Sequence, residues 1–113
     1  MKIFLTGGTG FIGLHVVKEL SDNQHEIIVL ARNTRKIPAL EKLKGVQLIE
    51  GNIADSNTYK NYLKGTDTLV HIALHWGDSA DEMLLNDTYS SVQLFELAAK
   101  AGIKEIIYTS SAG

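Results

Sequence analysis

The chain has 113 residues and a formal net charge of −2, with 44% hydrophobic and 21% charged residues. This length and composition are typical of one globular domain with its own hydrophobic core. The nearly balanced charge argues against a nucleic-acid or membrane-surface partner, and the lack of cysteine excludes disulfides, thiolate catalysis and cysteine-based zinc sites. Because no apolar run approaches a membrane span and no signal peptide fits before the first apolar residues, we expect a cytoplasmic protein.

The N-terminal stretch predicts a nucleotide-binding turn. Apolar residues 3–5 indicate a buried parallel strand, and a helical pattern follows over residues 11–22. Gly7 would permit a tight turn, Gly10 a close approach of the backbone to a pyrophosphate, and Gly13 close packing of the helix on the sheet. Free N–H groups at the start of the helix would complete an anion site. A glycine-rich turn without a ligand is the alternative.

Strands and helices alternate along the rest of the chain. The patterns predict strands over residues 26–31, 46–50, 68–73 and 105–109, and helices over about residues 38–44, after Asp55, and over about residues 81–100. The first helix should end in a left-handed cap at Asn23. Residues expected near one face of the long helix are Leu85, Val92, Phe95 and Ala99. This alternation predicts an α/β fold: a Rossmann-type parallel sheet of order 3-2-1-4-5 with helices on both faces.

Several separate stretches resemble one family. Residues 6–13, Thr-Gly-Gly-Thr-Gly-Phe-Ile-Gly, are similar to the T-G-G-x-G-F-I-G string of the extended short-chain dehydrogenases/reductases, a group of NAD(P)-dependent sugar epimerases, dehydratases and reductases. Residues 51–55 resemble its G-D-I-x-D, residues 70–73 its V-I-H-x-A-A segment, and residues 94–111 its long helix and fifth strand. The resemblance covers about the N-terminal third of a typical member. It implies an incomplete NAD(P)-binding Rossmann domain over residues 1–113, truncated after strand five.

The resemblance also implies site residues. Contacts to the cofactor are expected from Gly7, Gly10, Phe11, Ile12, Gly13, Asn52, Ile53, Ile72, Ala73, Leu74 and Ser110. Ser111 matches the family's catalytic Ser/Thr position, although a hydrogen-bonding turn is an equal alternative for Ser110 and Ser111. The family's Tyr-x-x-x-Lys pair has no counterpart in these residues. We therefore expect this polypeptide to bind the cofactor without turning over substrate.

The end of the second strand favours NADP over NAD. NAD-dependent members usually carry an acidic residue there that binds the ribose 2′-OH, whereas this chain has Ala31 followed by Arg32. A guanidinium can bind a 2′-phosphate bidentately, and Arg35 and Lys36 add positive charge. The alternative is that Arg32 is a solvated surface cation. Asn52 replaces the usual Asp near the adenine, and its amide can still pair with the adenine amino group.

The bulky residues after the fourth strand and the four histidines carry less information. Residues 74–78, Leu-His-Trp-Gly-Asp, would either define a substrate pocket or cap the sheet edge. The histidines predict no metal site, because the four-residue spacing of His71 and His75 suits a helix and His71 lies on a strand. His71 is expected to be a packed strand residue.

Two classes of function stay open. The first is the NAD(P)-binding portion of an epimerase, dehydratase or reductase that transfers hydride through the nicotinamide, with a small-molecule substrate such as a nucleotide sugar. The second is a non-catalytic NAD(P)-binding sensor. A flavin- or nucleotide-binding domain of another doubly wound family is a weaker third, against which the glycine string argues. The apolar fifth strand would leave an unpaired edge, so we also expect a homo-oligomer.

Overall fold

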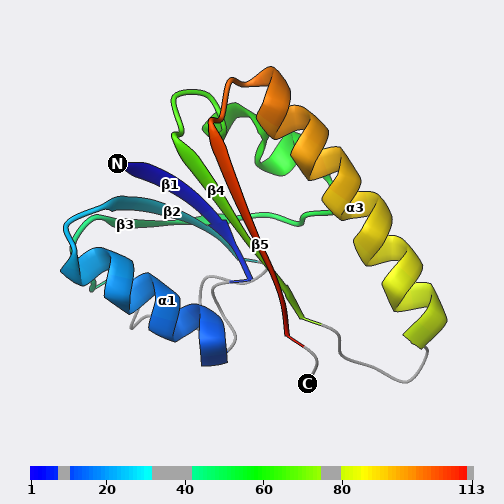
Figure 1. Ribbon diagram of the computed structural model, residues 1–113, viewed down its shortest axis with the longest axis horizontal. Helices are drawn as coiled ribbons and strands as arrows, with labels where there is room; N and C mark the ends of the chain where they lie inside the picture. The colour runs from blue at the N-terminus through cyan, green and yellow to red at the C-terminus, as the bar shows by residue number, and fades with distance from the viewer. Residues whose placement is uncertain (8–10, 32–41, 75–79, 112–113) are drawn as a thin grey trace.

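A computed structural model describes residues 1–7, 11–31, 42–74 and 80–111 of the chain. Five parallel strands form one sheet in the order β3-β2-β1-β4-β5 (Figure 1). The strands are β1 (Lys2–Thr6), β2 (Glu26–Ala31), β3 (Val46–Glu50), β4 (Thr68–Leu74) and β5 (Glu105–Ser111). The predicted α/β class and strand order are confirmed.

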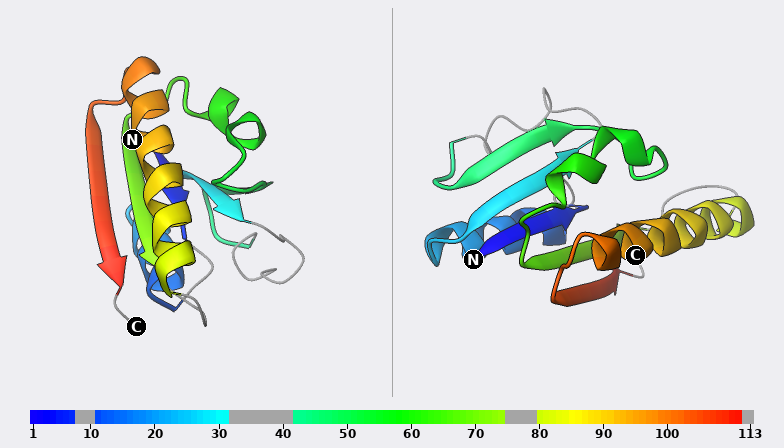
Figure 2. Two further views of the ribbon diagram at one scale, coloured as in Figure 1. Left: turned by 90° about the vertical axis from the view of Figure 1, so that its right-hand side faces the viewer. Right: turned by 90° about the horizontal axis from the view of Figure 1, so that it is seen from above.

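Helices cover both faces of this sheet. Helix α1 (Phe11–Asp22) lies on one face, and helix α3 (Ala80–Lys100) lies on the other together with two 3₁₀ turns, η2 (Ser56–Thr58) and η3 (Lys60–Tyr62) (Figures 1 and 2). In place of the short helix predicted after Asp55 there are these two 3₁₀ turns, and the side chain of Asp55 caps η2 by accepting the backbone N–H of Asn57 at 3.2 Å. The helix expected over residues 38–44 falls largely outside the described residues.

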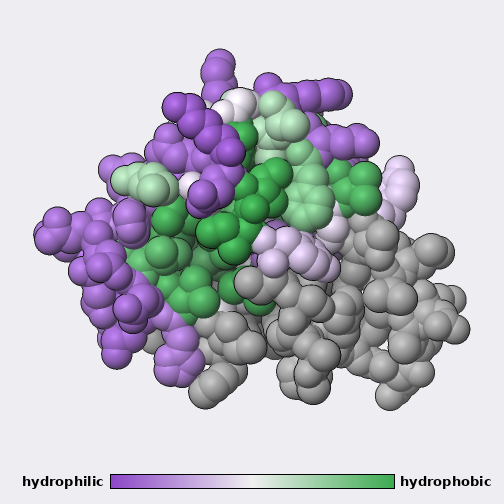
Figure 3. All heavy atoms as spheres, in the orientation of Figure 1, coloured by the Kyte–Doolittle hydropathy of each residue, from purple (hydrophilic) through white to green (hydrophobic). Residues whose placement is uncertain are grey.

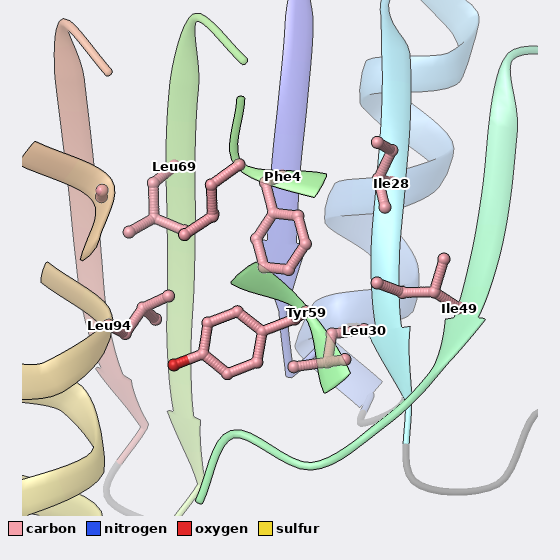
Figure 4. Packing of buried hydrophobic residues seen from close by; sticks show 9 residues of the cluster. Phe4, Ile28, Leu30, Ile49, Tyr59, Leu69 and Leu94 are labelled. Carbon is pink, nitrogen blue, oxygen red and sulfur yellow. The ribbon is translucent and has the colours of Figure 1, made fainter. Parts of the chain in front are cut away.

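Alternation along the strands builds two hydrophobic clusters. The cluster under α3 contains Phe4, Ile28, Leu30, Ile49, Tyr59, Leu63, Leu69, Leu94 and Ala98 (Figure 4). The cluster under α1 contains Ile3, Leu5, Val17, Ile27, Val29, Val70 and Ile72. Successive residues of one strand thus serve opposite faces, as a sheet buried on both sides requires. Each buried Leu, Ile or Phe side chain contributes about 1.5–3 kcal/mol.

The long helix buries a different stripe from the predicted one. Leu94 and Ala98 are fully buried, whereas Val92 is 49% exposed and Ala99 is exposed. The prediction for Val92 and Ala99 was wrong, because the sheet is covered by the i, i+3, i+4, i+7 stripe that starts at Ser91. Small and polar residues in that stripe hid it from a hydrophobicity pattern. The side chain of Leu85 lies outside the described residues.

Two element ends also differ from the predictions. Gln24, not Asn23, takes the left-handed conformation after α1, with a φ of 66°, and Asn23 instead donates from its side-chain amide to the carbonyl oxygen of Glu19 at 2.8 Å. Strand β5 continues through Ser110 and Ser111, which pair with Ala73 and Leu74 of β4. The two serines therefore belong to a strand and not to a turn.

Strand β5 forms an edge of the sheet and exposes apolar side chains. Ile106, Ile107 and Tyr108 are 41%, 43% and 50% exposed. Figure 3 shows apolar atoms gathered on the middle of the face where β4 and β5 lie in Figure 1. Within the described parts of the chain, no helix is both long and apolar enough to span a bilayer.

Candidate functional site

The sheet reverses its direction of strand addition between β1 and β4. Strands β2 and β3 lie on one side of β1, and β4 and β5 on the other. The chain leaves β1 for a helix on one face of the sheet and leaves β4 for a helix on the opposite face (Figure 2). In open parallel sheets, ligands bind in the crevice that opens at such a point, beyond the carboxyl ends of the strands.

Gly7 shapes the turn that leaves β1 at this crevice. Its φ of +76° lies in the left-handed region that favours glycine. A Cβ atom there would overlap the backbone carbonyl oxygen of Ile72 on β4. Conformation and space therefore both require glycine, as the sequence predicted for a tight turn.

The first turn of α1 supplies the polar part of the site. It begins at Phe11, and the first N–H groups of a helix have no partner within the helix and lie at the positive end of its dipole. Gly13, in the first turn of the helix, is buried. A glycine turn followed by a helix N-terminus fits a pyrophosphate, which needs N–H donors and no side chain in its way. Gly10 and the side chains of Phe11 and Ile12 lie outside the described residues.

A buried polar network lies directly below this turn. The Nδ1 atom of His71 hydrogen-bonds the hydroxyl of Thr6, and its Nε2 atom lies 2.8 Å from the hydroxyl oxygen of Ser91 on α3. All three residues are buried. The His71 ring also contacts Phe95 and Tyr108, with ring centroids 5.7 and 5.4 Å away. His71 is thus a packed strand residue, and the described residues contain no group of side chains suited to hold a metal ion.

Sequence reasoning missed Thr6 and Ser91 as members of this network. The available signals were a polar residue that ends an otherwise apolar strand and a Ser-Ser pair inside a long amphipathic helix. Neither pattern shows that one imidazole joins the two hydroxyls, because the contacts span 65 residues in one case and 20 in the other.

Side chains of the loop after β3 form hydrogen bonds with the backbone of the same loop. The Asn52 amide oxygen accepts the backbone N–H of Ala54 at 3.0 Å. The Thr58 hydroxyl accepts the backbone N–H of Asn52 at 3.1 Å and lies 2.7 Å from the carbonyl oxygen of Asp55, to which it donates. Asn52 itself is exposed. Because its amide oxygen already holds the loop, pairing with an adenine amino group would use the second lone pair of that oxygen.

A backbone hydrogen bond joins the carboxyl ends of β2 and β3. The backbone N–H of Gly51 donates to the carbonyl oxygen of Ala31 at 2.8 Å. Arg32 follows Ala31 directly in the chain, and Asn52 follows Gly51. Arg32, Arg35 and Lys36 lie outside the described residues.

The remaining expected contacts divide between the core and the end of the sheet. Ile72 is 3% exposed and belongs to the cluster under α1, and the half-buried Ile53 packs on the cluster under α3. Residues at the carboxyl end of the sheet are Ala73, Leu74, Ser110 and Ser111, which pair across β4 and β5. The side chains of these four residues lie outside the described part of the chain.

A parallel sheet of this order, with a left-handed glycine turn and a helix N-terminus at the β1–β4 crevice, defines a dinucleotide-binding domain of the Rossmann type. Comparison with known protein families agrees with this, since residues 7–113 match a family whose description is NAD(P)H-binding. The chain belongs to this NAD(P)H-binding family.

Individual relatives support the same assignment. UDP-glucose 4-epimerase of Neisseria meningitidis serogroup C is 31% identical over 124 residues, which span 98% of this chain and 37% of the relative. Photosystem II assembly factor Ycf39 of Synechocystis is 26% identical over 110 residues, spanning 97% and 33%. The crystal structure of UDP-glucose 4-epimerase from Bifidobacterium longum in complex with NAD+ and UDP shares the fold, with a TM-score of 0.81 at 24% identity over 99% of this chain and 37% of that chain.

These comparisons confirm the resemblance to the extended short-chain dehydrogenases/reductases. The chain is an NAD(P)-binding domain of the kind found in epimerase- and reductase-like enzymes. It spans about a third of the length of the curated relatives that it matches.

Proposed function

We propose that residues 1–113 form the cofactor-binding portion of an NADP-preferring epimerase, dehydratase or reductase. The observation that carries the proposal is the glycine turn at Gly7, packed on the backbone of Ile72 and followed by the N-terminus of α1. Residues 7–10 and the first turn of α1, including Phe11 and Ile12, would hold the pyrophosphate. Gly13 would keep that turn close to the sheet.

The adenosine half would lie across the ends of β2 and β3. Asn52 and Ile53 would contact the adenine, and Arg32 would pair with a 2′-phosphate. The support for this placement is the hydrogen bond from Gly51 to Ala31, since it joins the backbone just before Asn52 to the backbone just before Arg32. Without an acidic residue at the end of β2, a 2′-phosphate would meet no repulsion from that position.

The nicotinamide half would lie across the ends of β4 and β5, near Ile72, Ala73, Leu74 and Ser110. When bound, the nicotinamide supplies the hydride donor or acceptor. Ser111, in register with Leu74 at the end of β5, would donate a hydrogen bond to the reacting oxygen of the substrate. The names of two of the relatives make a nucleotide sugar the first substrate class to test. A cytoplasmic location and a homo-oligomer formed through β5 stay predictions.

Calorimetric titration of the chain with NADP and with NAD tests the proposal. We expect tighter binding of NADP, and Arg32→Ala should weaken NADP binding about tenfold or more while leaving NAD binding unchanged. Lys18→Ala, which removes an exposed cation on α1, is the matched control and should change neither affinity. Preference for NAD with an indifferent Arg32→Ala variant would refute the NADP part alone. Failure to bind either dinucleotide would refute the proposed function.

A non-catalytic NAD(P)-binding module is the second candidate, because one relative is named as an assembly factor. Incubation of the chain with NADP and a UDP-sugar, whose hydroxyl-bearing ring carbon can donate a hydride, tests whether this polypeptide itself catalyses hydride transfer, read as the appearance of NADPH absorbance. We expect the 113-residue chain to bind NADP without reducing it, since the proton-transferring Tyr and Lys of the family have no counterpart in it. Turnover that disappears in Ser111→Ala would contradict this expectation and assign catalysis to the chain itself.

A further inference from the structure

We propose that His71 is a positioning residue of the dinucleotide site, an inference that rests on the proposed function. One ring nitrogen holds Thr6, the last residue of β1, and the other is held by Ser91 of α3. Gly7, where the cofactor turn begins, is the next residue after Thr6. The imidazole therefore joins α3, on one face of the sheet, to the strand end from which the turn departs.

The strand register places His71 beside Thr6, one residue before the contact between Gly7 and Ile72 at the crevice. Thr6 and His71 are partners across β1 and β4, and the residues after them, Gly7 and Ile72, are in direct backbone contact. Displacement of Thr6 would therefore carry Gly7 away from Ile72 and change the position of Gly7 relative to the N-terminus of α1. Backbone N–H groups bind a pyrophosphate only when they are held in place, so such a change would lower affinity for the dinucleotide.

Helix α3 fixes the ring from its far side. Ser91 binds Nε2, and Phe95, one helical turn later, meets the ring edge-on with an interplanar angle of 80°. Tyr108 of β5 closes another side of the ring at a centroid distance of 5.4 Å. With the ring orientation set by these three neighbours, the Nδ1 atom points at Thr6 and fixes the rotamer of its hydroxyl.

A purely structural role would predict something different. Buried hydroxyl and imidazole groups are tolerated when each is hydrogen-bonded, but apolar side chains of similar size would fill this core without that requirement. Thr6, Ser91 and His71 are all at most 7% exposed in an otherwise apolar environment. A network that holds the turn at Gly7 in one geometry would explain why all three positions carry polar side chains.

Matched variants distinguish the hydrogen bond made by Nδ1 of His71 from the one made by Nε2. In His71→Asn the side-chain amide occupies the place of Nδ1 and can still reach Thr6, whereas in His71→Gln it occupies the place of Nε2 and can reach only Ser91. We expect Thr6→Val and His71→Gln to weaken NADP binding about three- to tenfold. Thr6→Ser and His71→Asn, which keep the contact to β1, should stay within about twofold of the wild type.

Affinity must be measured on folded protein. Titrations are run well below the lowest melting temperature of the set, with folding followed by circular dichroism. Leu63→Ala destabilises the hydrophobic cluster under α3 without removing a group of the His71 network, and it should keep wild-type affinity. The proposal is overturned if folded Thr6→Val binds like the wild type, if Leu63→Ala weakens binding as much, or if His71→Gln and His71→Asn behave alike. If the wild type binds no dinucleotide, the proposed function fails and this role with it; if it binds and Thr6→Val is unchanged, only the role of His71 fails.

Discussion

The α-carbon of Gly7 lies so close to the carbonyl oxygen of Ile72 that a methyl group cannot be placed between them. This contact joins β1 to β4 at the point where the proposed cofactor turn begins. Gly65 provides a comparison, because it has a similar φ of +83° and, apart from its chain neighbours, no atom of the described residues lies within 4 Å of a Cβ placed on it.

Gly7→Ala is therefore expected to cost more than Gly65→Ala. At Gly65 the loss should be about 1 kcal/mol, the usual penalty for a left-handed residue with a Cβ. At Gly7 the overlap with Ile72 adds to that penalty, and we expect at least about twice the loss. Urea unfolding of both variants measures the difference. Equal losses would mean that β4 moves aside at little cost.

The phenol of Tyr59 is buried without a hydrogen-bond partner among the described residues. Figure 4 shows the ring inside the cluster under α3, with its oxygen on the side of Leu94. Tyr59→Phe removes a group that loses its water on folding and gains nothing in return, so we expect the free energy of unfolding to rise by about 1 kcal/mol. Tyr62→Phe, at an exposed position, should leave it unchanged. A clear loss of stability in Tyr59→Phe would reveal a partner for the phenol.

Stability at alkaline pH should depend on the same phenol. Burial raises the pKa of Tyr59 above its ordinary value, and the negative charge of Asp55 raises it further. In the unfolded chain a tyrosine ionises near pH 10, so above that pH the unfolded state loses a proton that the folded state retains. The contribution of this ionisation to the free energy of unfolding is therefore fully present below about pH 10, and it falls as the pH rises toward the folded-state pKa.

Comparison of the wild type with Tyr59→Phe isolates this effect from other titrating groups. Denaturant unfolding between about pH 9 and about pH 11 should show a steeper loss for the wild type. Parallel pH dependence of the two proteins would argue that the phenol titrates equally in the folded and unfolded states.

The exposed edge of the sheet predicts self-association. No strand of the described residues pairs with the outer edge of β5, so its N–H and C=O groups there, next to the half-exposed Ile106 and Ile107, can pair with the same strand of a second copy. Sedimentation velocity should show a concentration-dependent dimer. Ile107→Lys should shift it to monomer, because a charged residue on an edge strand opposes pairing, while Val92→Lys on the exposed surface of α3 should not. A wild-type monomer at high concentration would contradict the prediction.

Sequence patterns predicted the sheet well, because its strands are short apolar runs bounded by glycine or polar residues. The runs at residues 26–31 and 46–50 match β2 and β3 at both ends, and the glycine spacing indicated the crevice at which the strand order reverses. These features depend on local composition, which a single sequence displays directly.

Other features depend on what meets in space and were missed. The buried stripe of α3 contains Ser91, so a hydrophobic pattern selected Val92 in its place. Nothing in the sequence indicated that the buried hydroxyl of Tyr59 would lack a hydrogen-bond partner among the described residues. The bond between Thr6 and His71 joins residues 65 positions apart, and only the register of β1 against β4 brings them together.

The two hydrophobic clusters end just below the carboxyl edge of the sheet. Leu5, Leu30, Ile49 and Ile72 are among the last core residues of their strands. The described residues at the strand ends beyond them belong to neither cluster, so substitutions there, Thr6 and Gly7 excepted, remove little core packing. A domain built this way can change its preferred ligand over evolutionary time while its framework stays the same.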